Sequence, residues 1–161
     1  MTSPTHRYEA RCRWTGSTGL GFEGYDRAHL AVAPPAEQHV TLTTGEARGD
    51  PRQLNPEQLL VMAASSCQLL WFLHVAAKAR IDVVEYEDEA VGLIPADENP
   101  VRVTRIELRP RIVVRGGASE DAVGRLCQLA HERCYIANSL RSEVTVEPRL
   151  EYAGRPSPAA R

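Results

Sequence analysis

The feature that most constrains this chain is an apolar stretch from Glu57 to Ala79 that contains neither glycine nor proline. Asn55 before it is a good helix N-cap, Pro56 suits the first helical position, and the helix dipole favours the charge of Glu57 in the first turn. The stretch therefore predicts a long helix. Because apolar residues occupy nearly all of its faces, we expect other elements to enclose it in the middle of the core.

Size and composition favour one domain with a mainly aliphatic core, since 43% of the 161 residues are hydrophobic and 6% aromatic. We assign residues 8–152 to this domain and residues 1–7 and 153–161 to flexible ends. A formal net charge of -2 gives no electrostatic footprint for nucleic acid or an anionic membrane. Gln68 and His74 within the long helix argue against a membrane span, and the amino terminus lacks the apolar core of a secretion signal. We expect a soluble cytoplasmic protein.

Strand signals lie on both sides of the long helix. A second helix is predicted from Ser119, which is followed by two acidic residues, to about Tyr135. The overall order β-β-(β)-α-β-β-α-β indicates an α+β fold. The predicted strands cover residues 8–14, 22–32, 39–43, 81–93, 101–114 and 144–147, and the fourth and fifth form a hairpin.

The chain has four cysteines, which are more typical of reduced or catalytic thiols than of a disulfide framework when no secretion signal is present. Cys67 lies late in the first predicted helix and Cys134 late in the second, an arrangement that suggests thiol redox chemistry. A cysteine in an apolar helix is also a common small core residue, so packing is the alternative role. Cys12 lies in the first predicted strand, where alternation favours an inward packing position.

Glu57 and Cys67 are ten residues apart on the same predicted helix. This separation is about 15 Å, so the two side chains cannot meet within one straight helix. If the acid serves the thiol, the helix must pair antiparallel with its copy about a two-fold axis near Met62, which places Glu57 of one subunit beside Cys67 of the other. The alternative is that Glu57 only complements the helix dipole.

A metal site is a weaker possibility. Cys127, His131 and Cys134 share one helix face at steps of four and three residues, but no fourth ligand is evident. Cys127 and Cys134 are also separated by a rise of about 10 Å, which prevents a disulfide between them in an intact helix.

Two motifs carry a family resemblance. The first is Asn55-Pro56-Glu57-Gln58-Leu59-Leu60 followed by Cys67, and the second is Ala130-His131 followed by Cys134 and Asn138. With these motifs, residues 8–152 resemble the family of osmotically inducible protein C and the organic hydroperoxide resistance proteins. The resemblance implies an intertwined α+β homodimer with two central helices flanked by sheets and active sites at the subunit interface.

The resemblance also implies a chemistry that needs no cofactor. Cys67 takes the position of the peroxidatic thiol, Cys134 that of the resolving thiol, and Glu57 that of the catalytic glutamate. The implied reaction reduces organic hydroperoxides through a Cys67 sulfenic acid and a Cys67–Cys134 disulfide, with a lipoyl dithiol as the reductant.

The chain departs from this family pattern in one respect. The family carries an arginine in the glycine-rich turn after the first strand, whereas this turn reads Thr18-Gly19-Leu20-Gly21. Arg27 is the provisional substitute and Arg48 a second one, and a solvated surface role is the alternative for each. Without a cation, apolar surroundings disfavour a thiolate. The departure favours the alternative function of a noncatalytic binding protein, in which the dimer interface holds a small apolar ligand and the cysteines merely line it.

Overall fold

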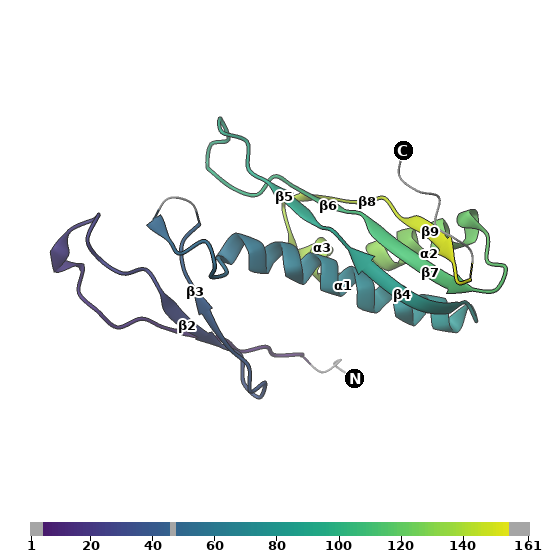
Figure 1. Ribbon diagram of the computed structural model, residues 1–161, viewed down its shortest axis with the longest axis horizontal. Helices are drawn as coiled ribbons and strands as arrows, with labels where there is room; N and C mark the ends of the chain where they lie inside the picture. Colours follow the sequence, from purple (N-terminus) through teal and green to yellow (C-terminus); the bar gives the residue numbers. More distant parts are fainter. Residues whose placement is uncertain (1–4, 46–47, 155–161) are drawn as a thin grey trace. The chain divides into compact units, whose positions relative to one another are not determined.

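The computed structural model describes residues 5–45 and 48–154 (Figure 1). Contacts divide the chain into two compact units, residues 1–59 and residues 60–161. Strands and helices together confirm the predicted α+β class. The assignment of one domain to residues 8–152 stays a prediction, and much of both predicted flexible ends lies outside the described residues.

The first unit contains a three-stranded antiparallel sheet in the order β1-β2-β3. The predicted strands over residues 8–14 and 22–32 are both too long, because a short 3-10 helix and turns occupy the segment between β1 and β2. Cys12 is exposed, so its predicted inward packing is wrong: β1 is an edge strand and all three of its residues are exposed. The elements are β1 (Arg11–Arg13), η1 (Thr18–Leu20), β2 (His29–Val32) and β3 (His39–Leu42).

The long helix α1 (Pro56–Lys78) begins with a capping box. The side-chain oxygen of Asn55 accepts the backbone N–H of Gln58 at 2.8 Å, and the side-chain oxygen of Gln58 accepts the backbone N–H of Asn55 at 3.0 Å. These reciprocal bonds satisfy two backbone donors at the helix start. They confirm the N-cap predicted at Asn55, with Pro56 as the first helical residue.

The second unit contains two three-stranded sheets, β4-β7-β9 and β5-β6-β8. The predicted hairpin is confirmed, since β4 pairs antiparallel with β7 and β5 with β6. Each predicted arm is divided into two strands, and the predicted last strand is followed by a further strand, β9, that the sequence did not indicate. The strands are β4 (Asp82–Asp88), β5 (Val91–Leu93), β6 (Arg105–Leu108), β7 (Pro110–Arg115), β8 (Glu143–Val146) and β9 (Arg149–Tyr152).

Asp88 stabilises the interruption between the two strands of each hairpin arm. One carboxylate oxygen accepts the backbone N–H of Arg109, the residue between β6 and β7, at 2.7 Å. The other accepts the hydroxyl of Ser65 on α1 at 2.5 Å. A backbone donor that the interrupted ladder leaves free is thereby satisfied, and the same carboxylate fastens the break to α1.

The second predicted helix is interrupted at Cys134. α2 (Glu120–Arg133) begins at Ser119, whose hydroxyl accepts the N–H of Ala122 at 3.2 Å, as the N-cap signal predicted. Cys134 has extended backbone angles, φ -67 and ψ 110, and a separate helix α3 (Tyr135–Ser139) follows. The predicted continuous helix to Tyr135 is therefore wrong. α2 and α3 form the crossover between β7 and β8, which allows the parallel pairs β6 with β8 and β7 with β9.

Only one face of α1 is buried in the single chain. Two clusters of core side chains pack on it, one centred on Phe72 with β7 and α2, and one on Ala64 with β6. Figure 1 shows this part of α1 running along the strands of the second unit. Met62 is 53% exposed and Leu70 64% exposed. The core clusters of the second unit thus cover only part of the apolar surface of α1, and its full enclosure stays a prediction.

α1 is also long and apolar enough to cross a membrane by length and composition alone, and it is the one such helix among the residues described. Its apolar surface has a structural use in this fold, because Phe72, Val75 and Ala76 pack in the larger core cluster.

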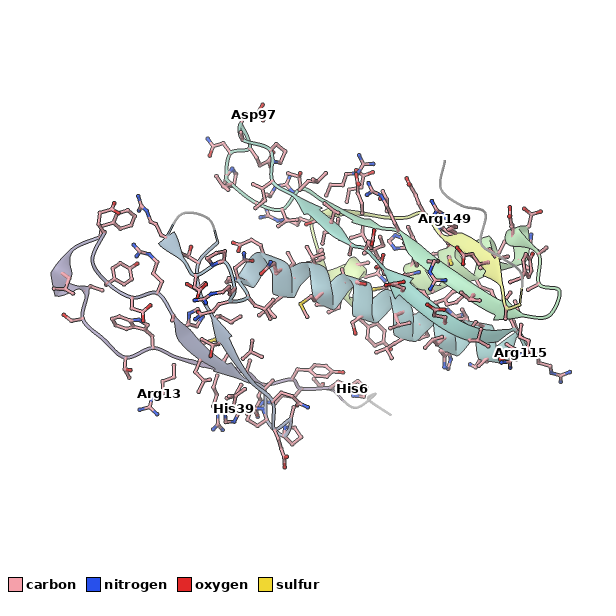
Figure 2. The ribbon with its side chains drawn as sticks, viewed as in Figure 1. His6, Arg13, His39, Asp97, Arg115 and Arg149 are labelled. Carbon is pink, nitrogen blue, oxygen red and sulfur yellow. The ribbon has the colours of Figure 1, made fainter. Side chains whose placement is uncertain are left out.

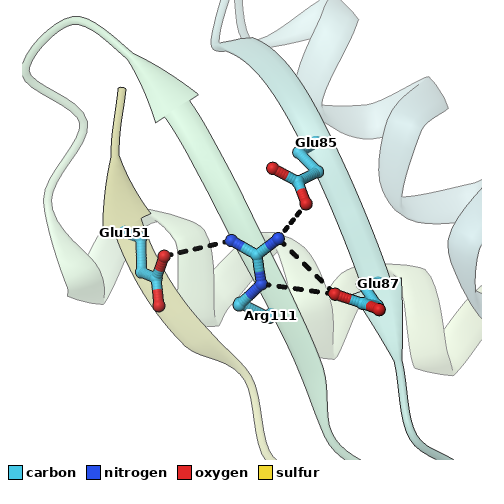
Figure 3. Close-up of polar contacts among 4 residues, drawn as sticks. All are labelled: Glu85, Glu87, Arg111 and Glu151. Atoms are coloured by element: carbon cyan, nitrogen blue, oxygen red, sulfur yellow. Dashed lines mark hydrogen bonds and ion pairs between the residues drawn. The ribbon is translucent and has the colours of Figure 1, made fainter. Parts of the chain in front are cut away.

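The outer face of sheet β4-β7-β9 carries a group of charged side chains centred on Arg111 (Figure 3). Arg111 on β7 binds Glu151 on β9 at 3.0 Å and Glu87 on β4 at 3.5 Å, and it also contacts Glu85 on β4. One guanidinium thus joins all three strands of the sheet. Figure 2 shows Arg115 at one end of the second unit and Asp97 at the tip of the loop between β5 and β6.

Candidate functional site

The fold brings the two predicted redox cysteines together. Cys67 lies in α1 and Cys134 at the junction of α2 and α3, close enough that the Cys67 side chain contributes to the raised pKa of Cys134. Both are free thiols, Cys67 half-buried and Cys134 buried. Two thiols 67 positions apart in sequence are therefore neighbours within the second unit.

The helix break gives Cys134 a particular environment. Its sulfur caps α3 by accepting the backbone N–H of Ala137 at 3.4 Å. Burial raises the pKa of Cys134 to about 11, the Ala137 N–H opposes this shift, and the neighbouring Cys67 side chain adds to it. Cys134 is therefore a neutral thiol at neutral pH. A buried, protonated thiol is not suited to meet substrate first.

Cys127 is set apart from this pair. It is 2% exposed in the core cluster around Phe72, and burial raises its pKa to about 12. Because Cys127 packs in this core cluster and is not part of the Cys67–Cys134 pair, it acts as a packing residue. Among residues 5–45 and 48–154, no group of three His, Cys, Asp or Glu side chains is placed to hold a metal ion, so the face with Cys127 and His131 gives the metal alternative no support.

Aromatic side chains stand next to the thiol pair. Trp71 follows Cys67 by one helical turn, and its ring packs edge-on against Tyr135, the residue after Cys134, at a centroid distance of 5.6 Å. The ring of His74 also packs edge-on against Trp71, at a centroid distance of 5.4 Å. Leu70, Trp71 and His74 line a small, mostly apolar pocket of about 210 Å³. Sequence reasoning missed this pocket, although Trp71 lies four residues after Cys67 on one helix face.

The provisional cation, Arg27, is held by its own loop in the first unit. Its guanidinium donates to the backbone carbonyls of Tyr25, at 3.0 Å, and of Phe22, and it stacks over the Tyr25 ring at 4.1 Å. Arg48 pairs with Glu23 at 3.2 Å and stacks over the Phe22 ring at 4.1 Å. These contacts shape the loop that follows the glycine-rich turn, and the catalytic role of Arg27 stays a prediction.

Glu57 is an exposed residue in the first turn of α1. The helix-dipole role fits this position, and its pairing with Cys67 of a second subunit stays a prediction. The site residues assigned from the sequence thus fall into two groups: Cys67 and Cys134 are neighbours within the second unit, while Glu57 and Arg27 belong to the first.

A further residue of the site is Gln68, which follows Cys67. It is 0% exposed, and its side-chain amide donates to the backbone carbonyl of Cys127 at 3.0 Å. The sequence contained a signal for it, since Gln68 lies four residues from both Ala64 and Phe72, on the face that the helix buries. A polar side chain at that spacing indicates a buried hydrogen bond.

Residues 49–149 match the family model of OsmC-like proteins. This chain belongs to the OsmC-like family. The match includes both motifs around Cys67 and Cys134 and confirms the family that the sequence resembles. It begins after the turn that lacks the arginine, so the departure lies outside the matched residues.

Solved structures agree with this family assignment. An OsmC-like protein of unknown function from Vibrio cholerae O1 biovar eltor str. N16961 is 30% identical, with a TM-score of 0.81 over 90% of this chain and 100% of that one. The organic hydroperoxide resistance protein OhrB of Bacillus subtilis shares the fold at 19% identity, with a TM-score of 0.61 over 91% of this chain and 98% of the other.

A curated relative is similarly distant. The uncharacterized protein YmaD of Bacillus subtilis (strain 168) is 23% identical over 105 residues, which are 63% of this chain and 70% of YmaD. This chain is thus similar to proteins of unknown function and shares its fold with a hydroperoxide resistance protein.

Proposed function

We propose that this OsmC-like protein is a thiol-dependent peroxidase that reduces organic hydroperoxides. The observation that carries the proposal is the proximity of Cys67 and Cys134, because two neighbouring thiols can supply the peroxidatic and the resolving group of this chemistry. The membership of hydroperoxide resistance proteins in the same fold family supports the choice of substrate.

The proposed reaction balances with these two thiols and one external reductant. The Cys67 thiolate attacks one oxygen of the O–O bond, which breaks to give a Cys67 sulfenic acid and an alkoxide that takes a proton to become the alcohol. The thiol of Cys134 attacks the sulfenic sulfur, a disulfide forms, and water leaves. A dithiol of the lipoyl class then exchanges with the disulfide, becomes oxidised itself, and restores both thiols.

The pocket of Leu70, Trp71 and His74 supports an apolar substrate. It lies on the same helix as Cys67, and Leu70 and Trp71 follow the thiol at three and four residues, so they share its side of α1. A hydroperoxide with an alkyl or aromatic group can place that group against these side chains while its peroxide oxygen reaches Cys67.

The exposed apolar face of α1 supports a homodimer. Met62 and Leu70 are more than half exposed, and Leu73 on the same side is 39% exposed. A second copy of α1, antiparallel about an axis near Met62, would cover this face and bring Glu57 of the partner beside Cys67. A Met62→Asp variant should then be monomeric by light scattering and lose peroxidase activity. A monomer with full activity would exclude a site shared between subunits.

The second candidate function is a noncatalytic dimer that binds a small apolar ligand. The observation that favours it is the engagement of the Arg27 guanidinium with the carbonyls of its own loop, together with the turn at residues 18–21 that lacks an arginine. In that case Cys67 and Cys134 only line a ligand site at the dimer interface. We place either version of the protein in the cytoplasm, as a soluble protein.

The two functions are separated by one assay with the reduced full-length protein. Cumene hydroperoxide is added, consumption is followed with dihydrolipoamide as reductant, and free thiols and disulfides are mapped by mass spectrometry. The peroxidase predicts the rapid loss of Cys67 and Cys134 together and no turnover in Cys67→Ser. Turnover at the parent rate in Cys67→Ser would exclude the mechanism, and Cys127→Ala serves as the matched thiol control, with parental activity expected.

A further inference from the structure

Gln68 is a polar residue on the buried face of an apolar helix. Its neighbours on that face are Ala64 and Phe72, and all three are 0% exposed. A buried amide is unfavourable unless its polar atoms are hydrogen-bonded. One of them is: the Nε2 group donates to the backbone carbonyl of Cys127 at 3.0 Å. The Oε1 atom finds no hydrogen-bond partner among the described residues.

The bond made by Nε2 joins the two helices that carry the thiol pair. Gln68 directly follows Cys67 on α1, and Cys127 lies on α2 about two helical turns before Cys134. A carbonyl oxygen has two lone pairs, so the Cys127 carbonyl can accept Gln68 while it serves the α2 ladder. The bond therefore fixes how α1 and α2 are placed along one another, one residue after Cys67 on α1 and about two turns before Cys134 on α2.

Stability alone does not account for an amide at this position. A methionine or leucine has a similar size and leaves no oxygen unpaired, so it would suit the apolar surroundings better. A directional bond does something that apolar packing does not: it selects one register between two helices that could otherwise slide by a fraction of a turn. Gln68, which sets this register, directly follows Cys67, the thiol that must reach Cys134.

We propose that Gln68 is a positioning residue that holds Cys67 within disulfide reach of Cys134. This inference rests on the proposed function, since it assumes that Cys67 and Cys134 form the redox pair. A disulfide requires Cα atoms within about 7 Å and a narrow range of side-chain directions. A loosened register lowers the effective concentration of one thiol at the other but leaves the reactivity of each separate thiol unchanged.

The test compares the disulfide equilibrium of the parent with that of Gln68→Met, which keeps the side-chain volume and removes the amide. The full-length proteins are equilibrated with mixtures of reduced and oxidised glutathione, quenched with acid, and the Cys67–Cys134 disulfide is quantified by mass spectrometry. We expect the effective thiol concentration to fall about tenfold in Gln68→Met, a shift of about 30 mV in reduction potential. In a Cys134→Ser background, iodoacetamide should alkylate Cys67 at the same rate whether or not the Gln68→Met substitution is also present.

Phe72→Leu is the matched control. Phe72 is buried on the same face one turn later, and its truncation loosens packing without removing the Gln68 bond. We expect its disulfide equilibrium to stay within about twofold of the parent, because the directional bond remains. An equal fall in Phe72→Leu and Gln68→Met, or no fall in Gln68→Met, would overturn the inference and leave Gln68 as an ordinary core residue.

Two further outcomes are informative. Should Gln68→Met fail to fold by circular dichroism, Gln68→Asn supplies the same readout, because its shorter amide cannot span the same gap to the Cys127 carbonyl. A parent protein that forms no Cys67–Cys134 disulfide at any glutathione ratio would overturn the proposed function itself. That result is distinct from failure of the positioning role, in which the parent and Gln68→Met form the disulfide equally well.

Discussion

The sulfur of Cys134 accepts the backbone N–H of Ala137 at 3.4 Å, and this contact marks the break between α2 and α3. The break turns a residue expected inside a helix into a cap, with its sulfur beside Cys67. A helix start favours a thiolate, whereas burial disfavours it, and at Cys134 burial is the larger effect. Cys134, the proposed resolving thiol, is consequently protonated at neutral pH.

The reactivity of Cys134 should therefore increase at unusually high pH. In Cys67→Ser, the rate of Cys134 alkylation by iodoacetamide should be slow at pH 8 and continue to rise above pH 9, because burial, the largest cause of the raised pKa of this thiol, remains in the variant. Peptide mapping of samples alkylated between pH 7 and 11 gives the profile, with exposed Cys12 of the same protein as the internal reference. A plateau already at pH 9 would contradict a buried neutral thiol.

The fold was predictable where the signal is local. The start of α1 follows from Asn55 and Pro56, whose hydrogen-bonding and backbone preferences act within one turn. The breaks in the hairpin were not predictable, because they depend on Asp88 reaching Arg109 across the sheet and Ser65 on a helix far away in sequence. No short-range pattern encodes a carboxylate that serves partners from two other elements.

The candidate site shows the same division. Cys67 and Cys134 could be paired from their motifs, but the sequence left open whether their side chains meet. Their contact depends on how α1 packs against α2, which includes the bond between Gln68 and the Cys127 carbonyl. Similarly, the apolar residues around α1 predicted that its faces are buried, but they did not show which elements or which molecule bury them. Met62, which is 53% exposed, lies on the side for which neither the sequence nor the second unit identifies the cover.

Burial of Cys127 should make the folded state sensitive to alkaline pH. Burial raises the pKa of this thiol from 9.0 to about 12, so between these values the unfolded chain ionises while the folded chain keeps its proton. The unfolded state then binds fewer protons, and the free energy of unfolding should fall as pH rises, by up to about 1.4 kcal/mol per pH unit. Urea unfolding between pH 8 and 11 measures the slope. Cys127→Ala should show a shallower decline, and an identical slope would contradict the prediction.

Trp71 should control the preference for apolar hydroperoxides. Replacing it with alanine removes the largest wall of the pocket formed with Leu70 and His74. We expect Trp71→Ala to raise KM for cumene hydroperoxide about tenfold, the amount expected for losing a few buried carbon atoms, and to change the rate with hydrogen peroxide less than about twofold. Trp14→Ala, in the first unit, is the control. Equal losses with both peroxides would place the role of Trp71 in folding, not in substrate contact.

Arg111 should contribute to stability through all three strands that it joins. Its side chain is 31% exposed and Glu151 is 17% exposed, so this pair is screened less by water than a surface ion pair. Arg111→Ala removes the cation from among three carboxylates, and we expect it to lower the free energy of unfolding by about 1–2 kcal/mol, measured by urea unfolding at low salt. Arg109→Ala, where the arginine side chain is 53% exposed and contacts Glu107, should change it by less than about 0.5 kcal/mol. Equal effects of the two substitutions would show that the Arg111 group acts only as surface charge.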